Sequence, residues 1–191
     1  MPFRFFIVQV LTTIRVPFAI MIAILLLGFE RTESILLISL IILCMSELSD
    51  MLDGLLARHL KVVSTWGAML DPYSDSVSRL IIYWTLAVAH LAIPIVPLAM
   101  AVRDVTVAYC RIILMKSGQS VSARWSGKIK AWAQGLGSIF LLLGPFYWKY
   151  TGTWTIYAIS WIVLFVTLGS IIEYALGAYA AEKKSRSQSL Q

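Results

Sequence analysis

Four aspartates occur at helical spacings within a mostly apolar part of the chain: Asp50, Asp53, Asp71 and Asp75. Asp50 and Asp53 are three residues apart, and Asp71 and Asp75 are four apart, so each pair lies on one face of a helix. A short connection over residues 59–66 makes the two helices antiparallel neighbours, which lets the four carboxylates converge. Carboxylates gathered at low dielectric need cations between them. All-oxygen ligands suit Mg²⁺ or Mn²⁺, and two such ions form the usual clamp for displacement at phosphorus.

Small residues and one arginine lie on the faces that carry these aspartates. Gly54, Ala57 and Arg58 lie four, seven and eight residues after Asp50, and Gly67 lies four residues before Asp71. Positions without bulk leave room for a flat or phosphorylated ligand to touch the backbone. Small residues also serve plain helix packing, so these positions by themselves leave both interpretations open.

The composition indicates that membrane-spanning helices carry these residues. Of the 191 residues, 59% are hydrophobic and 14% are charged, and the mean hydropathy is +0.81. These values exclude a disordered chain and a small disulfide-stapled domain. A bilayer core needs about 20 apolar residues per helix. The sequence predicts six such spans, at 6–28, 34–57, 68–90, 92–115, 127–147 and 153–180.

The distribution of basic residues predicts the orientation. The net charge of +6 comes from residues spread beside the apolar spans, a pattern typical of membrane topology rather than of nucleic-acid binding. With the N-terminus inside, ten basic residues flank the spans on the cytoplasmic side and two, Arg31 and Lys149, on the other. We therefore expect an all-α integral membrane protein with both termini cytoplasmic. One six-helix domain would cover residues 1–181, and 182–191 would form a polar C-terminal tail.

Charged residues inside the spans need partners, since a charge at the bilayer centre costs about 2.5–3.5 kcal/mol on insertion scales. Arg79 follows Asp75 by four residues, and this spacing predicts a helical ion pair between them. The sequence assigns no role to three further acids: Glu47, Asp104 and Glu173.

The aspartates and their neighbours together resemble the complete signature of the CDP-alcohol phosphatidyltransferases. The chain reads Asp50-x-x-Asp53-Gly54-x-x-Ala57-Arg58-(eight residues)-Gly67-x-x-x-Asp71-x-x-x-Asp75. The resemblance implies a six-helix membrane fold, usually a homodimer. It also implies a reaction in which an alcohol hydroxyl attacks the lipid-bearing phosphorus of a CDP-linked lipid and CMP leaves.

Carried over position by position, the resemblance implies a role for each signature residue. Two ions, Mg²⁺ or Mn²⁺, would be held by Asp50, Asp53, Asp71 and Asp75. Asp75 would also be the catalytic base for the attacking hydroxyl. The cytidine nucleotide would contact Asp50, Asp53, Gly54, Ala57, Arg58, Gly67 and Asp71.

Three further elements resemble the phosphatidylglycerophosphate synthase branch of this family. They are Leu11-Thr12-x-x-Arg15, Arg103-Asp104-(six residues)-Arg111, and Ser126-Gly127-Lys128-x-Lys130-(three residues)-Gln134. The chain departs from the branch pattern at three points. Tyr73-Ser74 precede Asp75 where the branch usually has Ala before the aspartate, Asp104 replaces Glu, and Ala131 replaces Thr.

Basic residues in the fourth and fifth spans predict an anionic acceptor. Arg103 and Arg111 are eight residues apart on one helix face, and Lys128 and Lys130 stand at the start of the fifth span. Glycerol 3-phosphate would need such a pocket, whereas a neutral alcohol would not. The two lysines also fit a simpler role as positive-inside residues that touch anionic lipid headgroups.

These patterns predict a phospholipid-biosynthetic transferase of the bacterial cytoplasmic membrane, with its active site facing the cytoplasm. Its substrates would be CDP-diacylglycerol and glycerol 3-phosphate, and its further partners membrane lipids and a second copy of the chain, without nucleic acid. The same fold could also serve a different acceptor, as in a phosphatidylinositol phosphate, cardiolipin or phosphatidylserine synthase. Two proteins of different classes share some of these features: a small cation or proton transporter that uses the intramembrane carboxylates, and a non-enzymatic membrane scaffold.

Overall fold

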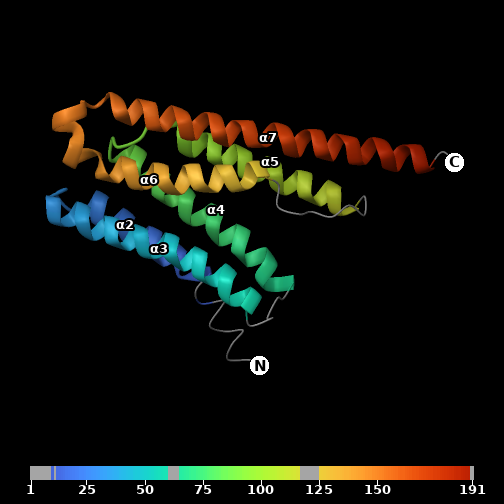
Figure 1. Ribbon diagram of the computed structural model, residues 1–191, viewed down its shortest axis with the longest axis horizontal. Helices are drawn as coiled ribbons and strands as arrows, with labels where there is room; N and C mark the ends of the chain where they lie inside the picture. Colours follow the sequence, from blue (N-terminus) through green and yellow to red (C-terminus); the bar gives the residue numbers. More distant parts are fainter. Residues whose placement is uncertain (1–9, 11, 60–64, 117–124, 190–191) are drawn as a thin grey trace.

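The computed structural model describes residues 10, 12–59, 65–116 and 125–189, and within these ranges it contains helices and turns but no strand (Figure 1). The helices are α2 (Arg15–Gly28), α3 (Glu33–His59), α4 (Thr65–Val88), α5 (Ile95–Lys116), α6 (Trp125–Thr151) and α7 (Trp154–Ser189). Each corresponds to one predicted span. The predicted start of the first span at residue 6 lies outside the described residues, and α7 continues through most of the predicted polar tail.

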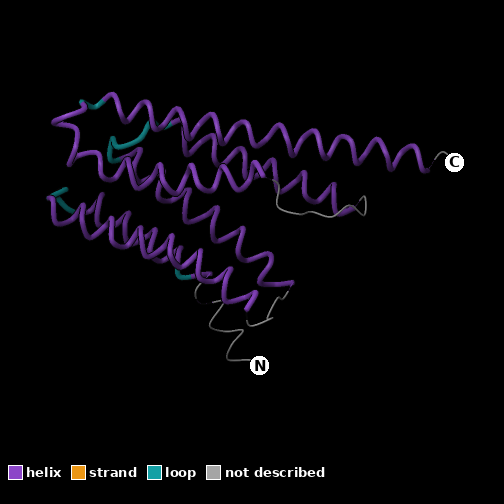
Figure 2. The backbone as a smooth tube through the Cα atoms, viewed as in Figure 1, coloured by secondary structure: helices purple, strands orange, loops and turns teal. Residues whose placement is uncertain are grey.

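The helices form two groups of three. Helix α7 packs along both α5 and α6, while α2 packs along both α3 and α4. Contacts of α3 with α6, and of α4 with α5 and α6, join the two groups. Figure 2 shows α7 running alongside α5 and α6, and α2 alongside α3. In this arrangement, the second half of α3 and the first half of α4 lie toward the start of α6.

The apolar core lies at one end of the bundle, near the α4–α5 and α6–α7 turns. It is built from nearly fully buried side chains of every described helix, among them Ile22, Leu43, Tyr83, Met100, Leu141 and Val163. The charged residues predicted inside the spans lie toward the opposite ends of the same helices. The bundle is therefore divided along its length into an apolar half, which supplies packing, and a polar half.

Two turns with left-handed backbone conformation close the apolar end. Gly152 has a φ of 75° and donates its N–H to the carbonyl of Trp148 at 2.7 Å, which ends α6. His90 has a φ of 58° after α4, and the next N–H, that of Leu91, donates to the carbonyl of Leu86 at 2.7 Å. This is the bonding pattern of a Schellman cap. The Arg31 guanidinium donates to the carbonyl of Ala89 and ties the α2–α3 turn to the same corner.

One helix of the described chain is long and apolar enough to cross a membrane by itself. It is residues Trp154–Ala180 of α7, with a mean hydropathy of 2.1, while α2 is apolar but shorter. The remaining helices carry charges in their interiors, which lower their hydropathy. The all-helical prediction is confirmed for the described residues, whereas six membrane crossings and cytoplasmic termini stay predictions.

Candidate active site

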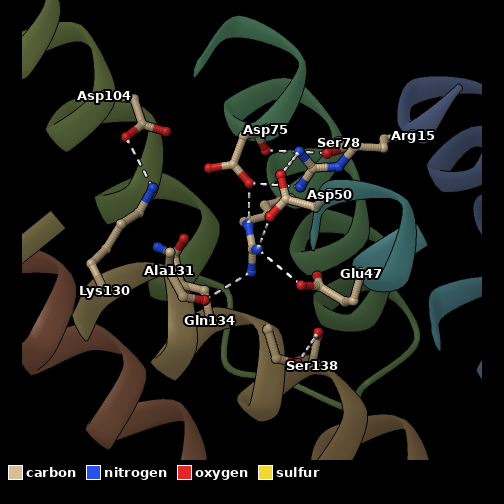
Figure 3. A network of polar contacts seen from close by, with 12 residues as sticks. Arg15, Glu47, Asp50, Asp75, Ser78, Asp104, Lys130, Ala131, Gln134 and Ser138 are labelled. Carbon is tan, nitrogen blue, oxygen red and sulfur yellow. Dashed lines mark hydrogen bonds and ion pairs between the residues drawn. The ribbon is translucent and has the colours of Figure 1, made fainter. Parts of the chain in front are cut away.

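Acids from two helices meet on one buried arginine. Arg15, the first residue of α2, is 1% exposed. Its Nη1 donates to Oδ1 of Asp50 on α3 at 2.5 Å, and its Nη2 donates to Oδ1 of Asp75 on α4 at 2.8 Å (Figure 3). Because a guanidinium presents its donors in a rigid planar fork, this contact fixes the two carboxylates relative to each other. The fold thus brings two of the four predicted aspartates together.

A second buried arginine, Arg79 on α4, extends the network to α6. Its Nε donates to Oδ1 of Asp75 at 2.6 Å, which confirms the ion pair predicted from their spacing. Its Nη2 donates to Oε2 of Glu47 on α3 at 2.9 Å, and its Nη1 donates to the carbonyl of Ala131 on α6 at 3.0 Å. Nη2 also lies 3.9 Å from Oδ2 of Asp50. We call the five residues Arg15, Glu47, Asp50, Asp75 and Arg79 the acidic cluster.

The other signature residues are described less fully. Asp71 is exposed on α4, one turn before Asp75. Asp53, Gly54, Ala57 and Arg58 belong to the C-terminal turns of α3, and Gly67 belongs to the first turn of α4. Their side-chain surroundings lie outside the described residues, so their predicted roles stay predictions. Among the side chains that are described, no three acids, histidines or cysteines are grouped as a metal site.

The acidic cluster has the donor chemistry that divalent ions prefer. Asp50 and Asp75 present carboxylates from two helices toward the same space, and both are bound there by cationic groups. Hard ions such as Mg²⁺ and Mn²⁺ take carboxylate oxygen ligands. The described part of the predicted ligand set therefore fits these ions.

A cluster of the opposite charge lies between α5 and α7. Arg103 is 6% exposed and donates its Nε to Oγ of Ser170 at 2.8 Å. Arg111 donates Nη2 to the hydroxyl of Tyr174 at 3.5 Å. Both guanidinium carbons lie 5.6 Å from the centroid of the Tyr174 ring, which is almost fully buried. A cation–π contact holds a guanidinium without neutralising it, so Arg111 keeps its charge for an anion, whereas Arg103 is also paired with Asp104 at 2.8 Å. The buried Nε of Arg111 has no hydrogen-bond partner.

Lys130 on α6 links the two clusters. It is 3% exposed, and its Nζ donates to Oδ1 of Asp104 at 3.4 Å. The same oxygen accepts a hydrogen bond from Nη1 of Arg103 at 2.8 Å. Lys130 lies on the side toward which one oxygen of Asp75 is directed (Figure 3). We call Arg103, Asp104, Arg111, Lys130, Ser170 and Tyr174 the basic cluster. It unites three of the four predicted acceptor residues, whereas Lys128 is exposed.

A cavity of about 450 Å³ opens beside the acidic cluster, between α3 and α6. Part of its lining is charged and consists of Glu47, Asp50 and Arg79. The rest is mostly apolar and includes Trp132 and Leu136, which are largely exposed on the outer face of α6. The cavity therefore connects charged groups with an apolar outer surface.

No role at the site was predicted for Glu47, Asp104, Ser170 or Tyr174. Glu47 lies three residues before Asp50, and this one-turn spacing is a signal that could have placed it on the same helix face. Ser170 and Tyr174 occur in an apolar run, where serine and tyrosine are ordinary packing residues. No local pattern marks them.

Comparison with known proteins identifies the family. The family model of the CDP-alcohol phosphatidyltransferases matches residues 5–170. A CDP-diacylglycerol–glycerol-3-phosphate 3-phosphatidyltransferase of Salmonella typhimurium is 29% identical over 148 residues, which cover 74% of this chain and 79% of the relative. The protein of the same name from Escherichia coli K12 is 30% identical over 146 residues, 73% of this chain and 78% of the relative. The chain therefore belongs to the CDP-alcohol phosphatidyltransferase family.

Proposed function

We propose that this protein transfers a phosphatidyl group from CDP-diacylglycerol to glycerol 3-phosphate, forming phosphatidylglycerophosphate and releasing CMP. The observation that carries the proposal is the position of Asp75 between the two clusters. One oxygen of this carboxylate is bound by Arg15 and Arg79. The other is directed toward the side of Asp104 and Lys130, whose cluster can bind the phosphate of an acceptor (Figure 3). The names of the two relatives specify the same donor and acceptor.

In the proposed reaction, the oxygen of the acceptor hydroxyl forms a bond to the lipid-bearing phosphorus. Asp75 accepts the hydroxyl proton, as a general base within hydrogen-bond reach can. The bond from phosphorus to the CMP oxygen breaks, and CMP leaves with the electron pair. Arg103, Arg111 and Lys130 hold the acceptor phosphate through charge-assisted hydrogen bonds.

The remaining signature residues serve the donor. Asp50, Asp53, Asp71 and Asp75 would hold two ions, Mg²⁺ or Mn²⁺, which would supply positive charge to the pyrophosphate and to the departing CMP. The nucleotide lies along the signature faces of α3 and α4, against Gly54, Ala57, Arg58 and Gly67.

The proposed donor is a lipid, and the outer surface of the bundle suits a bilayer. Four large apolar side chains on four helices are each more than half exposed: Ile41, Trp84, Leu98 and Phe165. Soluble monomers rarely expose large contiguous apolar patches. We therefore propose a multi-pass protein of the bacterial cytoplasmic membrane, with cytoplasmic termini and active site, that acts as a homodimer. The cavity between α3 and α6 would admit the apolar part of the donor beside Asp50.

The proposal is tested by the choice of acceptor. The purified protein in detergent, with CDP-diacylglycerol and Mg²⁺, is given glycerol 3-phosphate, inositol phosphate, serine or phosphatidylglycerol, and CMP release is measured. We expect release with glycerol 3-phosphate alone. Release with a different acceptor would overturn the acceptor assignment but keep the transferase reaction, and no release with any of them would overturn the proposed function.

A further inference from the structure

Arg79 is held from three sides, and two of the three groups that hold it lie outside the family signature. Glu47 binds its Nη2, the carbonyl of Ala131 binds its Nη1, and its Nε binds Asp75 on its own helix. The side chain is 4% exposed. All three guanidinium nitrogens donate a hydrogen bond, so the group cannot rotate without breaking one of them. Breaking a buried hydrogen bond costs free energy. Arg79 therefore has a fixed orientation set by α3 and α6.

This orientation determines which oxygen of Asp75 is available. Both Arg15 and Arg79 donate to the same atom, Oδ1. Figure 3 shows the second carboxylate oxygen of Asp75 directed away from Arg15, toward the side on which Asp104 and Lys130 lie. Two donors on one oxygen fix the rotation of the carboxylate. The second oxygen of Asp75 is thereby turned toward the basic cluster.

The space for Glu47 and Arg79 depends on a glycine of α6. A Cβ added at Gly135 would lie 2.9 Å from Oε2 of Glu47 and 3.1 Å from Nη1 of Arg79. The first distance is too short for real Cβ contacts, so one of the two side chains would have to move. Gly135 also lies one turn after Ala131, whose carbonyl binds Arg79. Alanine at position 135 would thus disturb the Glu47–Arg79 pair without changing any charge.

We propose that Glu47 and Gly135 are positioning residues: they fix Arg79 so that Arg79 and Arg15 turn the second oxygen of Asp75 toward the acceptor. Glu47 touches no substrate in this scheme and acts through Arg79. The inference rests on the proposed function, since it takes Asp75 as the base that receives the proton of the acceptor hydroxyl.

The first test compares Gly135→Ala with Gly169→Ala. Gly169 lies in α7, where an added Cβ would meet no atom within 4 Å, so it is a matched control. Misplacing a reacting group by about 1 Å can cost about a hundredfold in rate. We expect Gly135→Ala to lower kcat at least tenfold while KM for both substrates stays within twofold. Gly169→Ala should match the wild type. Melting temperature and gel filtration in detergent establish that both variants are folded.

The second test asks whether the alanine acts through Glu47. Glu47→Ala removes the side chain that the new methyl group meets. If the inference holds, the double variant Glu47→Ala/Gly135→Ala has the kcat of Glu47→Ala alone, because interacting positions are not additive. A further drop in kcat, equal to that of Gly135→Ala in the wild type, would contradict the inference. So would a folded Gly135→Ala variant of full kcat, or one in which only KM changes.

These outcomes differ from failure of the proposed function. An active wild type with an unaffected Gly135→Ala variant overturns the positioning role alone. A wild type that uses another acceptor overturns the acceptor assignment, and the same kcat comparison is then made with that acceptor. A wild type that releases no CMP with any acceptor overturns both proposals. Binding of CMP, measured by calorimetry, should be equal in wild type and Gly135→Ala.

Discussion

The acidic cluster and the basic cluster both contain two arginines, but they hold them differently. Arg15 and Arg79 are bound directly by carboxylates, so their charge is used within the protein. Arg103 and Arg111 both lie against the ring of Tyr174. Arg103 is also paired with Asp104, whereas Arg111 keeps a buried Nε without a partner. Acids outnumber bases in the first cluster and bases outnumber acids in the second. One region is therefore suited to cations and the other to an anion.

This difference follows from which helices meet. The acidic cluster joins α2, α3 and α4 and reaches α6 through a backbone carbonyl. The basic cluster joins α5, α6 and α7, and it contains one acid, Asp104. One oxygen of Asp75 is directed toward the side on which Asp104 and Lys130 lie (Figure 3). The arrangement separates the groups proposed for the donor from those proposed for the acceptor and leaves the proposed base between them.

Removal of divalent ions tests the acidic side of this comparison and should have the largest effect. Exhaustive chelation with EDTA is expected to abolish CMP release, because carboxylates alone cannot neutralise a pyrophosphate. Added Mg²⁺ or Mn²⁺ should restore it. The melting temperature of the chelated protein shows whether the fold is kept. Turnover that persists after chelation would contradict the proposed ligand set.

Asp75→Asn tests the group between the clusters. An amide cannot accept the proton of the acceptor hydroxyl, so kcat should fall about 10²- to 10⁴-fold, the usual contribution of a general base. KM for glycerol 3-phosphate should change little. Glu33→Gln, in the first turn of α3 and far from both clusters, is the control and should keep full activity. Equal activity of Asp75→Asn and the wild type would rule out the base assignment.

Arg111→Ala tests the basic side. A hydrogen bond to a charged group contributes about 1.5–3 kcal/mol, so KM for glycerol 3-phosphate should rise about ten- to a hundredfold. KM for CDP-diacylglycerol should stay within twofold, since the donor is assigned to the other cluster. Lys149→Ala removes a basic residue from the last turn of α6 and is the charge-matched control. A larger effect on the donor than on the acceptor would reverse the assignment of the clusters.

Tyr174→Phe should have the smallest effect. It removes the hydroxyl that accepts a hydrogen bond from Arg111 but keeps the ring that both guanidinium groups face. A net hydrogen bond of about 0.5–1 kcal/mol predicts a two- to fivefold rise in KM for glycerol 3-phosphate. Tyr157→Phe, on an exposed side chain of α7, is the matched control. An unchanged KM in Tyr174→Phe would mean that the ring alone holds Arg111.

Much of the fold was predictable because apolar runs and helix period are local properties of a chain. Six spans predicted from hydropathy correspond to the six described helices. The pairing of Asp75 with Arg79 followed from their spacing of four residues, which places both on one helix face. The signature itself specified the aspartates of α3 and α4, because its spacing is a local pattern as well.

The contacts between helices were not predictable in the same way. Glu47 received no role because its partner Arg79 lies on another helix, and its rotation toward that helix is set by packing. Tyr174 is 63 residues from Arg111 in the chain, and nothing in its neighbours shows that two arginines lie against its ring. Lys128 and Lys130 have equal charge and adjacent positions in the motif, yet one is exposed and the other is buried beside Asp104.

By itself, the sequence determined which helices form, which faces carry the signature acids, and the family to which they belong, since all three depend on spacing along a single chain segment. Only the tertiary structure decided that Arg15 joins Asp50 to Asp75, that Glu47 binds Arg79, and that Arg103 and Arg111 lie against the same Tyr174 ring. These contacts depend on how each helix is rotated about its axis and shifted along its neighbour. Those two variables are set by the packing of whole side-chain surfaces, and no local spacing encodes them.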